Sequence, residues 1–194
     1  MTLPERDSRI TLVEDLFTYH IFGIPSESRR YQKDIGSYAL TIGGLVGREL
    51  RLSVAQIRND FPQVSGVMVL QCMTNIHWGR LRFTGARLLD VLDHAGIQEK
   101  AFKIAVHGAD GFDMDLRVDE VRQRPDAFLL AHSMNDQPLI VGHGFPLRLT
   151  ADGKYGFKWP KWLSRIELVD YDYKGHYEGK RRWSDEATRG QPVT

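Results

Sequence analysis

The stretch VSGVMVLQCMTN, residues 64–75, carries an apolar run into the only cysteine of the chain. Its valine, leucine and methionine residues predict a buried strand over residues 64–72. Gln71 and Thr74-Asn75 flank the thiol with polar groups, which indicates that Cys72 lies at the end of the strand. Functional groups are commonly placed at strand ends and in the loops after them. The thiol could be a buried small hydrophobe, a nucleophile or a metal ligand, and its position alone favours the first of these.

The composition is that of a globular protein with one core. The chain has 194 residues, of which 42% are hydrophobic and 26% charged, and these values exclude a disordered or fibrous protein. We therefore expect a single domain over residues 1–194. The net charge of +1 provides no field for a polyanion, so nucleic acid is not an expected partner.

Cysteine content and hydropathy exclude several further classes. One cysteine forbids an internal disulfide and any zinc or iron–sulfur site built from several cysteines. No apolar run is long enough to span a bilayer, and the opening MTLPERDSRI lacks the apolar segment of a secretory signal. The expected location is the cytoplasm, with the periplasm as the alternative for a processed chain.

Along the chain, the sequence pattern indicates strands and short helices that do not strictly alternate, which predicts an α+β fold. Residues 1–36 are expected to be irregular, and residues 174–194 to form a polar arm over the surface. Helices are predicted from the Ser53 capping box to Asn59, from Thr84-Gly85 to the stop at Gly96, and over residues 118–123. The remaining strands are predicted at residues 37–46, 101–106, 112–116, 127–132, 145–149 and 165–169.

A second candidate site is the segment GHGFPLRLTADGKYGFKWPKWLSR, residues 142–165. Its cations face the single acid Asp152, and its glycines let backbone N–H groups approach a ligand, which suits a phosphate or another compact anion. A solvated strand and loop face is the alternative, although the interleaved Trp159 and Trp162 favour a covered loop. His143 could donate to such an anion or have no role. The cations of the segment are Arg148, Lys154, Lys158, Lys161 and Arg165.

Five segments, in order, resemble the molybdopterin-binding oxidoreductase domain of the sulfite oxidase superfamily. They are YALTIGGLV at 38–46, VLQCMTN at 69–75, GRLRFTGARLLDVL at 79–92, MNDQPLIVGHGFPLRL at 134–149 and KYGFKWPKWLSRIELVD at 154–170. The resemblance covers nearly the whole chain past residue 37. It implies a mixed α+β fold around one molybdenum that carries a pyranopterin dithiolene, oxo ligands and one protein thiolate. Cys72 occupies the thiolate position, and a soft thiolate suits such a metal.

The resemblance also implies roles for other residues. Cys72 is the metal ligand and a catalytic residue. Apart from the resemblance, His132 and His77 are the expected catalytic groups near the substrate, because imidazoles that titrate near neutral pH suit proton-coupled transfer. His20, within Thr18-Tyr19-His20, is expected to keep a cofactor contact. The remaining residues expected to bind the cofactor are His143, Arg148, Gly156, Phe157, Lys158 and Lys161.

The substrate is less well defined than the cofactor. Sulfite-oxidising members of the family have an arginine where this chain has Thr18, a tyrosine at His132 and a further arginine near Ile76. A sulfite dianion requires several cations, and this sequence keeps fewer.

The expected function is therefore two-electron oxygen-atom transfer on a small molecule by a molybdenum cofactor enzyme. A separate electron-transfer partner, such as a cytochrome, is expected because no second redox centre is evident. The alternatives are a sulfoxide-type reductase of the same family and a metal-free binding module that retains the fold.

Overall fold

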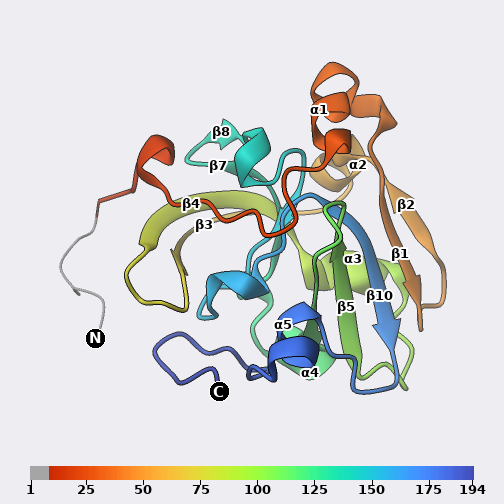
Figure 1. Cartoon of the computed structure of the whole chain (residues 1–194). Helices are drawn as coiled ribbons and strands as arrows, with labels where there is room; N and C mark the ends of the chain where they lie inside the picture. Colours follow the sequence, from red (N-terminus) through yellow and green to blue (C-terminus); the bar gives the residue numbers. More distant parts are fainter. Residues whose placement is uncertain (1–8) are drawn as a thin grey trace.

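The computed structural model describes residues 9–194 and contains two sheets with short helices around them (Figure 1). In the first sheet the strand order is β2-β1-β10-β5-β6. The pair β1–β10 is parallel, and the other three pairs are antiparallel. The predicted α+β class is confirmed by this mixture. The strands are β1 (Leu40–Gly44), β2 (Leu50–Leu52), β5 (Lys103–Gly108), β6 (Asp113–Arg117) and β10 (Leu163–Val169).

The second sheet is antiparallel and is built on a long hairpin. Its order is β3-β4-β7-β8, and β9 also pairs with β7. The predicted strand over residues 64–72 is confirmed as β3, which ends at Gln71, so Cys72 begins the turn of the hairpin. The strands are β3 (Gln63–Gln71), β4 (Trp78–Arg87), β7 (Leu129–Met134), β8 (Gln137–Pro138) and β9 (Arg148–Leu149).

Local capping signals place two of the helices correctly. Ser53 and Gln56 form the predicted capping box, with Ser53 Oγ accepting from the Gln56 N–H at 3.2 Å. Gly96 ends α3 with φ 80°, a left-handed conformation that glycine adopts without strain. The α-helices are α1 (Ser26–Lys33), α2 (Val54–Asn59), α3 (Leu88–Ala95), α4 (Val118–Gln123) and α5 (His176–Arg181). None of the helices in residues 9–194 is long and apolar enough to cross a membrane.

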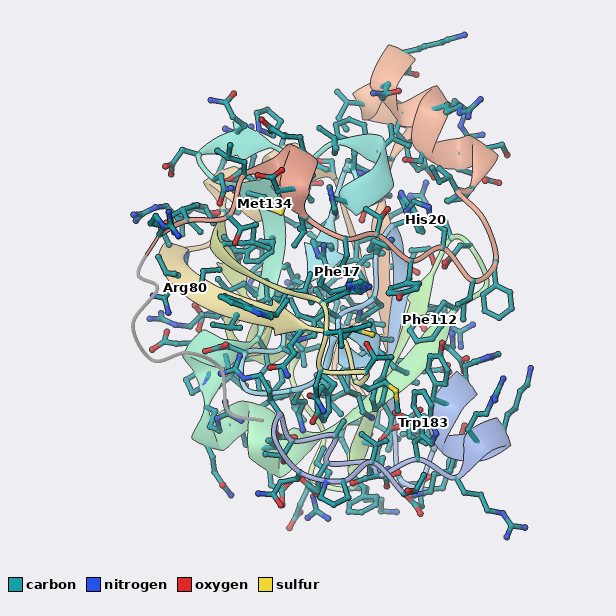
Figure 2. All side chains as sticks on the ribbon, turned by 60° about the vertical axis from the view of Figure 1, so that its left-hand side comes forward. Phe17, His20, Arg80, Phe112, Met134 and Trp183 are labelled. Carbon is teal, nitrogen blue, oxygen red and sulfur yellow. The ribbon has the colours of Figure 1, made fainter. Side chains whose placement is uncertain are left out.

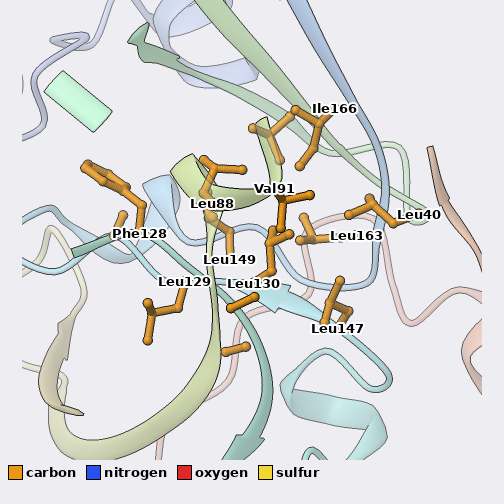
Figure 3. Close-up of a cluster of buried hydrophobic side chains, with 14 of the residues drawn as sticks. Leu40, Leu88, Val91, Phe128, Leu129, Leu130, Leu147, Leu149, Leu163 and Ile166 are labelled. Carbon is orange, nitrogen blue, oxygen red and sulfur yellow. The ribbon is translucent and has the colours of Figure 1, made fainter. Parts of the chain in front are cut away.

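The hydrophobic core brings both sheets together with α3 (Figure 3). Its central side chains are fully buried, and burial of each leucine or valine contributes roughly 1.5–3 kcal/mol. They include Leu40, Leu163 and Ile166 from the first sheet, Leu88 and Val91 from α3, and Leu129, Leu130 and Leu149 from the second sheet.

Four predictions about local structure differ from the observed fold. Thr84-Gly85 does not open a helix but belongs to β4, where it pairs with both β3 and β7, and the helix begins only at Leu88. The expected irregular segment 1–36 contains α1, and the strand expected at 145–149 is reduced to the two residues of β9. The C-terminal arm also differs, because α5 packs onto the protein and buries Glu178. These elements depend on contacts with residues distant in sequence, and local sequence patterns carry no information about such contacts.

Candidate functional site

A cavity of about 290 Å³ opens beside Cys72, at the end of β3. Segments far apart in the sequence form its walls: an N-terminal strap (residues 11–22), the turn after β3, the β5–β6 turn, residues 143–161, and a C-terminal segment (residues 174–194). Figure 2 labels Phe17, Phe112 and Trp183, which represent three of these segments. The lining residues are Phe17, Thr18, Tyr19, Ile21, Leu70, Cys72, Met73, Thr74, Asp110, Phe112, His143, Arg148, Gly156, Phe157, Trp159, Pro160, Lys161, Tyr177 and Trp183.

The turn that carries Cys72 is fixed by its own hydrogen bonds. The Cys72 N–H donates to the His77 carbonyl at 2.8 Å, and the Asn75 N–H donates to the Cys72 carbonyl at 3.0 Å. Asn75 adopts φ 62°, and its side chain accepts a bond of 2.7 Å from Gln71 Nε2. These contacts hold the half-buried thiol at the cavity wall rather than inside hydrocarbon.

Arg148 is the most unusual charge in the cavity, because it is only 2% exposed and makes no ion pair with any described carboxylate. Its two terminal nitrogens donate to the carbonyls of His143 and Trp159 at 3.2 and 3.3 Å, and Nε has no hydrogen-bond partner. Burial lowers the pKa of Arg148 to about 10. A buried guanidinium in this state is stabilised by an anion that reaches it.

Lys161 adds a second cation beside Arg148. Its Nζ donates to the carbonyls of Tyr19 and Gly142 at 2.7 and 3.3 Å, and it lies 4.7 Å from the centre of the Trp162 ring. Burial, and then the charge of Arg148, lower the pKa of Lys161 to about 7. Lys161 can therefore change its protonation state near neutral pH.

His143 contributes a neutral imidazole to the same wall. Its side chain is buried, and burial followed by the charges of Arg148 and Lys161 lowers its pKa to about 4. Gly144 follows the 3-10 turn Val141–His143 and has φ 104°, and an added Cβ would lie only 3.1 Å from the Cβ atoms of Arg148 and Lys161. Glycine fits here because it adopts this φ without strain and leaves room for both side chains.

Six of the predicted site residues line one cavity, and four do not. Cys72, His143, Arg148, Gly156, Phe157 and Lys161 are in its wall.

Lys158, His20, His77 and His132 are the four outside it. Lys158 is fully buried and pairs with Asp115 at 3.2 Å and with Glu178 at 2.5 Å. His20 Nε2 bonds the Gly142 carbonyl at 2.9 Å behind the wall.

The two histidines expected near the substrate differ in their surroundings. His77 stacks on Phe17, a wall residue, at 5.7 Å between ring centres, so it supports the cavity from behind. His132 instead bonds Gln63 at 3.0 Å on the second sheet, and burial lowers its pKa to about 4. Since His132 is not among the lining residues, the structure does not place it with Cys72.

Sequence analysis missed three wall residues of chemical interest. Asp110 is a carboxylate near Lys161 whose pKa is raised by burial, and it accepts from the Phe112 N–H at 3.1 Å. Its signal was an Asp-Gly turn between two predicted strands. Tyr177 and Trp183 come from the expected polar arm, and their rings stack 4.3 Å apart at 4°. Aromatic residues within an otherwise charged tail were the available signal.

Comparison with known proteins agrees with this geometry. Residues 27–177 match the oxidoreductase molybdopterin binding domain. The protein belongs to this family. A relative, the uncharacterized oxidoreductase YuiH of Bacillus subtilis (strain 168), is 31% identical over 150 residues, covering 76% of this chain and 73% of YuiH.

Larger relatives share the same region. Human mitochondrial sulfite oxidase is 29% identical over 172 residues, covering 75% of this chain and 31% of that protein. The NADPH nitrate reductase of Mycosarcoma maydis is 26% identical over 201 residues, covering 84% of this chain and 20% of that enzyme. The sulfane dehydrogenase SoxCD of Paracoccus pantotrophus has the same fold, with a TM-score of 0.66 at 22% identity over 76% of this chain and 40% of that chain. This chain therefore spans 31% of the length of human sulfite oxidase and 20% of the length of the nitrate reductase.

Proposed function

We propose that the protein binds molybdenum with its pyranopterin and performs two-electron oxygen-atom transfer on a small molecule. The observation that carries the proposal is that Cys72 and the unpaired, buried Arg148 line the same cavity. When bound, this cofactor supplies reversible two-electron redox chemistry at the metal.

The residues of the cavity fit this cofactor. The phosphate of the pterin is an anion, and Arg148 and Lys161 offer cationic donors that form no ion pair with a carboxylate of residues 9–194. Residues 9–194 contain no group of three or more His, Cys, Asp or Glu side chains that could hold a metal by themselves. A metal here would therefore depend on Cys72 together with the sulfur atoms of the organic chelate, which is a soft ligand set.

The protein's own side chains would bind, orient and exclude water. Arg148 and Lys161 would hold the anionic end, and Gly156 would let that loop pack against β3, since an added Cβ would lie 3.3 Å from the Gln71 carbonyl oxygen. Trp159 and Phe157 would cover the site with apolar surface. In the oxidising direction the substrate gains an oxygen atom from water and releases two electrons and two protons, and the reverse applies to reduction. A separate electron carrier would exchange the electrons.

Metal and pterin analysis tests the proposal. Protein from a host that makes the cofactor is expected to contain both groups in stoichiometric amounts, and Cys72→Ser is expected to lose molybdenum. Tyr171→Ala is the control, because Tyr171 is exposed and outside the cavity wall. Equal molybdenum in wild type and Cys72→Ser would refute the role of the thiolate. Wild-type protein without metal or pterin would identify a binding module that has only kept the fold.

A sulfoxide-type reductase is the second candidate. It is favoured because the positively charged or titratable basic side chains of the described wall are limited to His143, Arg148 and Lys161. Rates with sulfite and an electron acceptor, compared with rates for sulfoxides and a reduced dye, distinguish the two reactions.

A further inference from the structure

Phe157, Tyr177 and Trp183 form an aromatic wall of the cavity, and of these three residues Trp183 lies outside the family match. The match ends at residue 177, whereas Trp183 lies beyond it and lines the cavity together with Cys72. Trp183 stacks on Tyr177. Phe157 meets Trp183 edge-on, with 5.0 Å between the two ring centres. Offset and edge-on arrangements of this kind are the favourable ones for aromatic rings.

This wall is fixed to the body of the protein on both sides of Trp183. Glu178 pairs with the fully buried Lys158 at 2.5 Å, and Asp185 pairs with the buried Lys103 at 2.8 Å. Further along, Arg189 donates to the Val69 carbonyl, in β3, at 2.8 Å. Because both flanks are anchored, the aromatic surface is preformed, and a ligand would not have to order it.

Charge and apolar surface occupy different parts of the cavity. All three basic side chains of the described wall come from residues 143–161. The strap and the C-terminal segment contribute apolar and aromatic side chains instead, namely Phe17, Tyr19, Ile21, Tyr177 and Trp183. If the cofactor's anionic end occupies Arg148 and Lys161, the wall offers a second ligand no free strong cation.

From this separation we propose that the substrate is an uncharged molecule with an aromatic ring beside the sulfur or nitrogen atom that gains or loses oxygen. Trp183 is the specificity-determining residue, since its ring would stack on the ring of the substrate. A small oxyanion such as sulfite is disfavoured at the same wall because no cation remains to hold it. This inference rests on the proposed function, in which the cofactor fills the cationic end.

Binding to the oxidised, cofactor-loaded enzyme tests the inference, because oxidised enzyme cannot reduce a sulfoxide. Calorimetry is carried out with methyl phenyl sulfoxide, dimethyl sulfoxide and sulfate, after metal and pterin content have been measured. Sulfate is the anionic probe because the oxidised enzyme could oxidise sulfite. Wild type is expected to prefer the aryl compound. Trp183→Ala should weaken binding of methyl phenyl sulfoxide by roughly 3- to 10-fold, the range for one lost aromatic contact, while dimethyl sulfoxide binding is unchanged. Trp183→Phe should retain most of the preference, and Tyr171→Ala should behave as wild type.

Three results would overturn the inference. If Trp183→Ala weakened binding of both sulfoxides equally, Trp183 would have no selective role. Tighter binding of sulfate than of methyl phenyl sulfoxide would show that an anion is preferred. Loss of pterin from Trp183→Ala, but not from Tyr171→Ala, would show that the ring packs on the cofactor instead. Wild type without molybdenum and pterin would refute the proposed function and remove the basis of this inference with it.

Discussion

Two buried cations of one segment, Arg148 and Lys158, should respond in opposite ways to replacement by methionine. Lys158 is held by the carboxylates of Asp115 and Glu178, while Arg148 has carbonyl partners and an unsatisfied Nε. Lys158 therefore stabilises the fold, and Arg148 is available for a ligand. The comparison separates a structural from a binding role, although both side chains are almost completely buried.

The expected magnitudes follow from the environment of each charge. Burial lowers the pKa of Arg148 from its ordinary value to about 10, which corresponds to about 3 kcal/mol of unfavourable burial of the charged form. Arg148→Met relieves this, but deprives two carbonyls of donors at about 1 kcal/mol each. The free energy of unfolding of cofactor-free protein should thus stay within about 1 kcal/mol of wild type. Lys158→Met leaves buried carboxylates without this partner and should cost about 3–5 kcal/mol.

Urea unfolding of protein from a host that cannot make the pterin measures both values. From a competent host, Arg148→Met should bind the pterin roughly 10- to 100-fold more weakly, since one charge-assisted hydrogen bond contributes about 1.5–3 kcal/mol. The reasoning fails if Arg148→Met loses as much stability as Lys158→Met. It also fails if Arg148→Met retains full pterin content.

Three further measurements test the site and the fold. The pKa of Lys161 is about 7 in the native protein and higher in the unfolded protein. Between about pH 7 and about pH 10 the unfolded state therefore binds more protons, so the free energy of unfolding should rise with pH over this range. Urea unfolding of Lys161→Met should show no such rise. Inorganic phosphate binding to cofactor-free protein should weaken several-fold from about pH 6 to about pH 8, and calorimetry showing no change would contradict the assignment. Gly85→Ala should destabilise the protein by about 3 kcal/mol or more, because its Cβ would lie 2.2 Å from the Leu130 carbonyl oxygen, whereas Gly66→Ala, with open space around it, should be near neutral in thermal unfolding.

The parts of the molecule that could be predicted from sequence are those with local causes. The α2 capping box and the Gly96 stop depend on neighbours within a few residues, and both are confirmed. The ordered motifs also indicated the family correctly, and Cys72 lies at a cavity as expected.

Long-range contacts decide the remaining features. Thr84 and Gly85 are predicted to open a helix because an apolar helical stripe follows them, yet pairing with β3 and β7 makes them part of a strand. Likewise, nothing within the segment 142–165 distinguishes Lys158 from Arg148. The carboxylates of Asp115 in β6 and Glu178 in α5 pair with Lys158 and not with Arg148.

The strand order of the first sheet has a consequence for synthesis of the protein. β1 is made early, but its parallel neighbour is β10, so Thr41 pairs with Arg165. During translation, β1 and β2 must wait until most of the chain has left the ribosome before this sheet can close. Such distant pairings fold slowly, and a nascent chain with an exposed β1 edge would depend on protection from aggregation during that interval.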